Sequence, residues 1–95
     1  MSAYIIVDVS VNDPDRYEAY KAMVPPTLEP FGGKFLVRGG NNEVLEGDWS
    51  PSRTVVIAFD SMENAKAWHD SEIYREARDL RQATATTSMI VVEGG

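Results

Sequence analysis

Apolar and polar side chains alternate at the start of the chain. Over residues 3–11 every odd position is apolar, whereas Asp8 and Ser10 occupy even positions. A period of two is typical of a β-strand that buries one of its faces. Three further apolar runs, bounded by turn residues, predict strands as well: 34–38, 54–60 and 86–93.

A helix is predicted directly after the first strand. Asp13 can cap free backbone amides, and Pro14 suits the first turn of a helix. Tyr and Val side chains then recur at helical spacing, so we expect this helix over 14–24. Proline lacks an amide hydrogen and clashes with the preceding turn, and the pair Pro25-Pro26 is therefore expected to end the helix or kink it. A last helical turn can resume after the prolines, over 27–30.

A second helical region follows the third strand. Ser61 is placed to cap its start, and Ser71 marks a joint beyond which the helix continues to residue 82. In this last part three apolar residues are expected to form the buried side: Ile73, Ala77 and Leu80.

The strongest turn signal in the chain separates the second and third strands. It is the run Gly39-Gly40-Asn41-Asn42. We expect residues 43–46 to return from this turn as the second arm of a hairpin. A loop with an exposed Trp49 then leads to the third strand.

The order strand–helix–strand occurs twice in 95 residues, which predicts one domain over 1–95. Two such halves are typical of a ferredoxin-like α+β sandwich, in which four antiparallel strands carry helices on one face.

The other face of such a sheet is usually polar. Here it is apolar too, since Tyr4 and Ile6 share the even face of the first strand, and Ile90 and Val92 that of the last. We therefore expect two copies to pair sheet to sheet as a face-to-face homodimer.

Composition narrows the classes of function and partner. The chain has 9 Lys and Arg against 15 Asp and Glu, a net charge of −6 at pH 7, which argues against a nucleic-acid partner. No apolar run approaches the ~18 residues of a membrane span, and the first residues lack the basic start of a signal peptide, so no membrane association is expected. Cysteine is absent, which excludes disulfides and thiolate metal sites and fits a reducing cytoplasm.

His69 is the single histidine of the chain. Histidine is the side chain that most readily exchanges protons near neutral pH, so His69 is a candidate general acid–base group at the helix joint. The alternative is an ordinary surface residue. One histidine without cysteine cannot form an ordinary zinc site, and nothing else in the chain supports a haem ligand. We therefore expect neither a metal nor a cofactor.

Four arginine side chains are candidate anion-binding groups, because the planar guanidinium matches a carboxylate or phosphate: Arg38, Arg53, Arg78 and Arg81. Arg38 precedes a glycine pair whose backbone could approach a ligand closely, and Arg81 lies late in the last helix. The alternative is pairing with neighbouring carboxylates on a solvated helix face, which we prefer for Arg75 and Arg78.

Three further side chains are candidates for substrate binding. Glu46 and Trp49 flank Gly47-Asp48, and they form either the edge of a pocket or a clasp in which Trp49 inserts into a second subunit. Tyr74 is either a core residue whose hydroxyl reaches a partner or one wall of the pocket.

Several motifs together resemble a known family. They are Arg38-Gly39-Gly40, Val44-Leu45-Glu46-Gly47-Asp48-Trp49, the strand 55–59, the set Ala65, Trp68, Ser71, Tyr74, Arg78 and Arg81, and Val91-Val92-Glu93-Gly94. The combination is similar to the small bacterial domain-of-unknown-function family 1330, within the dimeric α+β barrel superfamily. The resemblance implies the barrel fold and a homodimer. Related barrels include small monooxygenases and lactone isomerases, but the likeness implies no mechanism, because function resides in sites rather than in folds.

Two classes of function remain open. In the first, a homodimer binds a small anionic or aromatic metabolite in a cavity between sheet and helices. In the second, a cofactor-independent enzyme, isomerase-like or monooxygenase-like, uses His69 as acid and base and Arg38 or Arg81 as an anion clamp. Tyr74 and Trp49 would wall its cavity. The two classes differ in whether His69 opens into that cavity.

Overall fold

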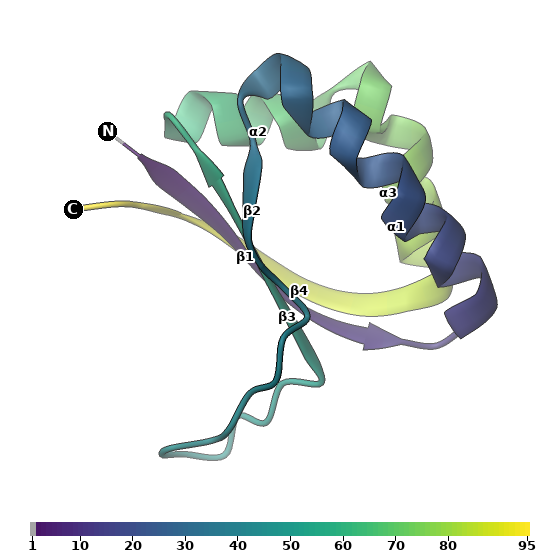
Figure 1. The fold of residues 1–95 in the computed structure, drawn as a ribbon, viewed down its shortest axis with the longest axis vertical. Coiled ribbons are helices and arrows are strands. Elements are labelled where there is room, and N and C mark those ends of the chain that lie inside the picture. The colour runs from purple at the N-terminus through teal and green to yellow at the C-terminus, as the bar shows by residue number, and fades with distance from the viewer. Residues whose placement is uncertain (1) are drawn as a thin grey trace.

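One antiparallel sheet of four strands carries three α-helices on a single face (Figure 1). The strands are β1 (Ala3–Val11), β2 (Lys34–Arg38), β3 (Arg53–Phe59) and β4 (Ala85–Glu93). The helices are α1 (Pro14–Leu28), α2 (Met62–Asp70) and α3 (Glu72–Thr84), with a 3-10 turn, η1 (Glu29–Phe31), after α1. This computed structural model describes residues 2–95, so Met1 of the predicted domain 1–95 lies outside the described residues. The predicted ferredoxin-like α+β fold is confirmed.

β1 and β3 form the centre of the sheet, whose strand order is β2-β3-β1-β4. Antiparallel pairing sets Ile5 of β1 opposite Ile57 of β3 and Val91 of β4. Because side chains alternate along a strand, the odd positions of β1 share one face with these partners. This face meets the helices, and there Ile5, Val7 and Val9 are at most 4% exposed.

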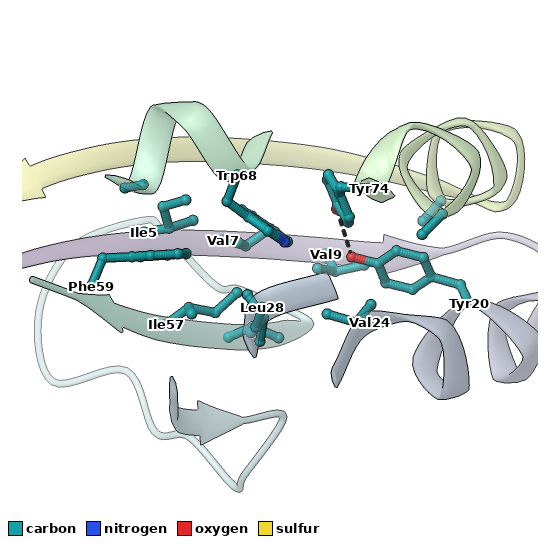
Figure 2. Packing of buried hydrophobic residues seen from close by; sticks show 14 of the residues in the cluster. Ile5, Val7, Val9, Tyr20, Val24, Leu28, Ile57, Phe59, Trp68 and Tyr74 are labelled. Atoms are coloured by element: carbon teal, nitrogen blue, oxygen red, sulfur yellow. Dashed lines mark hydrogen bonds between the residues drawn. The ribbon is translucent and has the colours of Figure 1, made fainter. Parts of the chain in front are cut away.

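Two aromatic side chains from the helices fill the core above this face (Figure 2). Trp68 of α2 and Tyr74 of α3 are both fully buried, and their ring centroids lie 4.0 Å apart. Phe59 of β3 also packs against Trp68, with the centroids 5.7 Å apart. The aromatic cluster therefore joins both helices to the sheet.

A short chain of hydrogen bonds joins α2 to α1. The Trp68 Nε1–H donates to Thr27 Oγ1 at 3.0 Å, and the Thr27 hydroxyl donates to the carbonyl of Val24 at 2.6 Å. All three residues are buried, so each of these polar groups depends on the others for a partner. These two hydrogen bonds fix the indole ring and thereby the spacing of the two helices.

α1 continues through both of its prolines to Leu28, so the predicted end at residue 24 is wrong. Pro25 has no amide hydrogen and cannot bond the carbonyl of Lys21, four residues earlier. That carbonyl instead accepts from Arg38 Nη2 of β2, at 2.6 Å. A side chain from the sheet thus replaces the hydrogen bond that the proline removes.

Residues 39–52 form a long loop rather than a hairpin turn with a returning arm. Arg38 at the end of β2 is already paired with Val55 of β3. β3 therefore occupies the pairing positions of β2, and the predicted arm 43–46 belongs to no strand of the described chain. That prediction is wrong. The loop projects from the sheet on the side away from the helices (Figure 1).

The buried side of α3 is formed by four residues at helical spacing: Tyr74, Ala77, Arg81 and Thr84. Ile73 is 50% exposed, so its predicted burial is wrong. The buried side of the helix contains Tyr74, and the residue directly before it therefore points toward solvent. Leu80 is partly buried beside the core. Ser71 caps α3 as predicted, since its Oγ accepts from the amide of Tyr74.

The sheet face away from the helices, which we call the open face, is apolar along its centre. The register sets six side chains next to one another there: Tyr4, Ile6, Val56, Ala58, Ile90 and Val92. Ile90 is 59% exposed and Val92 41%. Polar residues follow at one end, where Asp8 lies opposite Thr54 and Ser88. No helix of residues 2–95 covers this face, and the sheet is therefore apolar on both sides, as predicted.

We predict that Thr27→Val destabilises the protein by about 1–3 kcal/mol, because the buried Trp68 N–H loses its acceptor while side-chain volume changes little. Urea unfolding, followed by tryptophan fluorescence at a fixed chain concentration, measures this loss. Thr86→Val is the matched control. Its hydroxyl accepts from Asn12 Nδ2 on the exposed surface, so its removal should cost less than about 0.5 kcal/mol. Equal losses of stability in the two variants would contradict the role of the buried hydrogen bonds.

Candidate functional site

A small internal cavity lies between the helix-covered face of the sheet and the helices. Its volume is about 20 Å³, which is room for about one water molecule. Apolar side chains form most of its wall, among them Val7, Val9, Val24, Val55, Ile57 and Trp68. Figure 2 shows several of these side chains converging from the strands and from α1 and α2.

Four cationic side chains also line this cavity: Lys21, Arg38, Arg53 and Arg81. No carboxylate is among its described lining residues, although the whole chain carries a net charge of −6. The acidic excess thus lies elsewhere, and positive charge is concentrated around one apolar space. We call it the arginine cavity.

Two of the four cations are engaged by other groups. Lys21 Nζ lies 3.0 Å from Glu18 Oε1, so its charge is balanced. Arg38 is exposed, donates to the Lys21 carbonyl and lies over the ring of Phe35, with its guanidinium carbon 4.3 Å from the ring centroid. The other two, Arg53 and Arg81, form no ion pair with any residue of 2–95.

Arg81 is almost completely buried by its place on the inner side of α3. It is 3% exposed, and its Nη1 donates to Thr87 Oγ1 of β4 at 2.5 Å. Its Nε–H is buried and has no hydrogen-bond partner within residues 2–95. A buried charge without a counter-ion is costly, by several kcal/mol in real proteins. Arg81 therefore brings an unused donor and an unbalanced charge to the cavity wall.

Arg53, at the start of β3, lies against the beginning of the 39–52 loop. Gly39 makes room for it, because a Cβ at this position would collide with the Arg53 guanidinium. Gly39 also has a φ of +73°, which glycine adopts without strain. The guanidinium carbon of Arg53 lies 5.9 Å from the ring centroid of Tyr17. The buried Arg53 Nε–H, like that of Arg81, has no partner in the described part of the chain.

Two tyrosines meet beside the cavity. The hydroxyl of Tyr20, on α1, lies 2.9 Å from that of Tyr74, on α3 (Figure 2). Burial raises the pKa of Tyr20, and the neighbouring Tyr74 raises it further, so this phenol keeps its proton. One hydrogen bond uses only one of the two hydroxyl hydrogens, which leaves the other free to donate. Tyr20 lines the arginine cavity, whereas Tyr74 lies behind it in the core.

A wider hollow of about 220 Å³ adjoins the arginine cavity at the start of α1. We call it the vestibule. The two spaces share Tyr17, Lys21 and Arg53, while Val11 and Pro14 add an apolar wall to the vestibule.

His69 lies outside the arginine cavity. It is half-buried near the end of α2 and lines a separate groove of about 200 Å³ between α2 and β4. Its Nδ1 lies 3.3 Å from Asp70 Oδ1, and Lys66 lines the same groove. Neither Arg38 nor Arg81 lines that groove, so the structure does not bring the three residues of the predicted acid–base mechanism together.

The other arginines of α3, Arg75 and Arg78, do not line the arginine cavity and contact nearby groups instead. Arg75 pairs with Glu72, with 3.5 Å between Nη1 and Oε2, as expected. Arg78 differs from expectation, because its Nη1 donates to the carbonyl of His69 at 2.7 Å and so satisfies the end of α2.

Glu46 and Trp49 belong to the 39–52 loop and lie on the other side of the sheet from the arginine cavity. Both are exposed, Trp49 to 62%. The Trp49 Nε1–H donates to Asp8 Oδ2 at 3.1 Å, and Asp8 stands at the end of the open face. Of the predicted substrate-binding residues, only Arg38 lines the arginine cavity and Tyr74 lies next to it.

Arg53, one of the candidate anion-binding arginines, lines the cavity, whereas Tyr20 is a cavity residue that the sequence-based site omits. Tyr20 repeats at helical spacing with the other apolar residues of α1, which indicates burial but no polar partner. Its contact with Tyr74 spans 54 positions of the chain, and no local pattern reports such a contact. The glycine at residue 39 is the signal that indicates where Arg53 lies, since it permits a large side chain to lie across the loop.

Within residues 2–95, no group of three or more His, Asp or Glu side chains is placed to hold a metal ion. In the same range, no helix combines the length and apolar character needed to cross a membrane.

Solved structures share this fold. A protein of unknown function from Rhodopseudomonas palustris matches with a TM-score of 0.79 at 21% identity, over 98% of this chain and 82% of its own. A dimeric ferredoxin-like protein of unknown function from Jannaschia sp. CCS1 matches with a TM-score of 0.73 at 12% identity, over 99% and 100%. SnoaB, a cofactor-independent oxygenase from Streptomyces nogalater, matches with a TM-score of 0.67 at 10% identity, over 99% and 93%. At these identities the likeness shows the fold alone.

Curated proteins provide no match to this chain. The model of the family described as Domain of unknown function (DUF1330) matches residues 2–95. The match extends over the same strands and helices that build the cavity and the open face, and it confirms the resemblance found in the sequence. The chain is therefore a member of the DUF1330 family.

Proposed function

We propose that this protein is a homodimer that binds a small anionic metabolite in the arginine cavity of each subunit. The subunits pair through their open faces, and the ligand enters from the vestibule. The observation that carries the binding proposal is the lining of the cavity, with four cations and no carboxylate among its described residues. A cytoplasmic location suits a chain without cysteine.

The homodimer is supported by the open face. Exposed apolar side chains such as Ile90 and Val92 lie side by side there, and pairing two copies of the face removes them from water. An apolar sheet face left in water would favour aggregation. The protein from Jannaschia sp. CCS1, which shares the fold, is described as dimeric.

The 39–52 loop supports a clasp between subunits. It carries three exposed apolar side chains, Val44, Leu45 and Trp49, and Leu45 is 92% exposed. The hydrogen bond to Asp8 holds Trp49 beside the open face, where a partner subunit would lie. Aromatic residues are enriched at the centres of such interfaces. In the proposed dimer the loop therefore extends the contact beyond the sheet.

Binding of an anion is supported by the donors that the cavity leaves unused. The Nε–H groups of Arg53 and Arg81 are buried without partners in residues 2–95. An anion would accept from them and balance their charge, and such charge-assisted hydrogen bonds are the strong ones. The donors are already in position before the ligand arrives, which lowers the entropy lost on binding.

An enzyme is the alternative, and the oxygenase SnoaB shows that this fold occurs in a cofactor-independent enzyme. The predicted mechanism requires His69 next to Arg38 or Arg81. His69 lines the groove beside β4 instead, and no His, Asp or Glu lines the arginine cavity within the described chain. The cavity thus lacks the groups most used for proton transfer, and this favours binding over catalysis.

For the dimer, we predict that Ile90→Asp shifts the protein toward the 10.5 kDa monomer, because the charge would be buried at the centre of the paired faces. Size-exclusion chromatography with light scattering at micromolar concentration measures the mass. Ile73→Asp is the matched control, since Ile73 is similarly exposed but lies on α3, away from the sheet. A wild-type protein that is monomeric under these conditions would refute the dimer.

For the ligand, we predict that Arg81→Met abolishes stabilisation by small organic anions and makes the free protein more stable, by about 1 kcal/mol or more. The unbalanced charge is lost while the length of the side chain is nearly kept. Thermal unfolding at constant ionic strength, with and without a panel of organic anions, measures both effects. Arg75→Met, in an exposed pair with Glu72, is the control and should keep the response to anions. A free Arg81→Met protein that is much less stable than wild type would assign the guanidinium a structural role.

A further inference from the structure

The unused hydrogen bonds of the arginine cavity specify the chemistry of its ligand. Arg81 and Arg53 each offer one buried Nε–H. Tyr20 and Tyr74 share one hydrogen bond, and neither hydroxyl has another partner in residues 2–95, so one phenolic hydrogen is also free. Each of these unused hydrogens needs an acceptor, and a ligand that satisfies them must therefore present acceptors.

The number of donors matches a carboxylate better than a phosphate. A carboxylate has two oxygens, and the two guanidiniums with the tyrosine pair can provide each of them with a hydrogen bond. A phosphate brings additional charged oxygens. These would face Val7, Val9 and Ile57, which cannot replace the water that the oxygens lose.

The size of the cavity favours the same choice. The free space of about 20 Å³ is room for about one water molecule, and a planar carboxylate head demands less additional room than a tetrahedral phosphate does. The rest of the ligand must therefore lie in the vestibule, which offers about 220 Å³.

The vestibule favours an uncharged body. Val11, Pro14 and the ring of Tyr17 give it an apolar side. Apart from Arg53, which the carboxylate would engage, its charged residues are Lys21 and Glu18, which lie 3.0 Å apart and balance each other.

From these observations we infer that the ligand is a monocarboxylate with a small apolar or aromatic body. Its carboxylate accepts from Arg81, Arg53 and the free hydroxyl of the tyrosine pair, and its body fills the vestibule. This inference rests on the proposed function, because it names the class of anion that the same cavity binds.

Isothermal titration calorimetry with four probes tests the inference: benzoate, hexanoate, benzyl alcohol and inorganic phosphate. At least one of the two carboxylates is expected to bind, with phosphate at least about ten-fold weaker and benzyl alcohol weaker still, because it has the body without the charge. Binding of a carboxylate should also move the NMR signals of the Arg53 and Arg81 Nε–H groups, which a remote site would not do.

Tyr20→Phe tests the free hydroxyl. It is expected to weaken binding of the carboxylate by about ten-fold, because one hydrogen bond to a charged group is lost while the ring is kept. Tyr4→Phe is the matched control, since Tyr4 lies on the open face, and it should leave the affinity unchanged.

The outcomes separate the two proposals. Phosphate that binds as tightly as both carboxylates, through Arg81, would overturn the carboxylate inference while leaving the proposed anion binding intact. Benzyl alcohol that binds as tightly as benzoate would likewise overturn the carboxylate inference. Full affinity in Tyr20→Phe would overturn the part assigned to the tyrosine pair. Failure of every probe, and of the anion panel, would overturn the anion-binding function itself.

Discussion

The guanidinium of Arg81, buried between α3 and the sheet, constrains the whole structure. Arg81 shares the inner side of α3 with Tyr74, Ala77 and Thr84, so the helix cannot turn it toward water without exposing the tyrosine as well. Packing of the helix thus holds in place a charge that on its own opposes folding. The surroundings compensate only in part, with the hydroxyl of Thr87 and a space beside the guanidinium. Such a site is organised by the core of the protein.

Alternation along β1 separates the cavity from the open face. Val7 and Val9 form part of the cavity wall, while Tyr4 and Ile6 belong to the open face. A slip of one residue in register would exchange the two sets. This division could be predicted from the sequence, because it follows from the polarity of successive residues in 3–11. The same holds for the helix caps, each of which involves residues only a few positions apart.

The parts that could not be predicted depend on partners distant in the sequence. The exposure of Ile73 follows from the packing of Tyr74, a choice that the apolar character of both residues leaves open. Arg81 could be singled out as a candidate anion-binding residue, but its burial arises from the helix face that the core selects. The position of His69 in a separate groove, rather than in the cavity, is likewise decided by how α2 packs on the sheet. Patterns in the sequence therefore identified candidate residues without showing which of them share a site.

The replacement of a helical hydrogen bond by Arg38 has a consequence for the evolution of the family. Pro25 and Arg38 depend on each other, because the proline frees the carbonyl that the guanidinium then binds. A mutation that restores an amide at residue 25 makes the guanidinium at residue 38 dispensable for α1, whereas loss of the arginine alone leaves the carbonyl without its donor. The two positions are thus expected to coevolve, and the covariation should be strongest where β2 lies against α1 as it does in this protein.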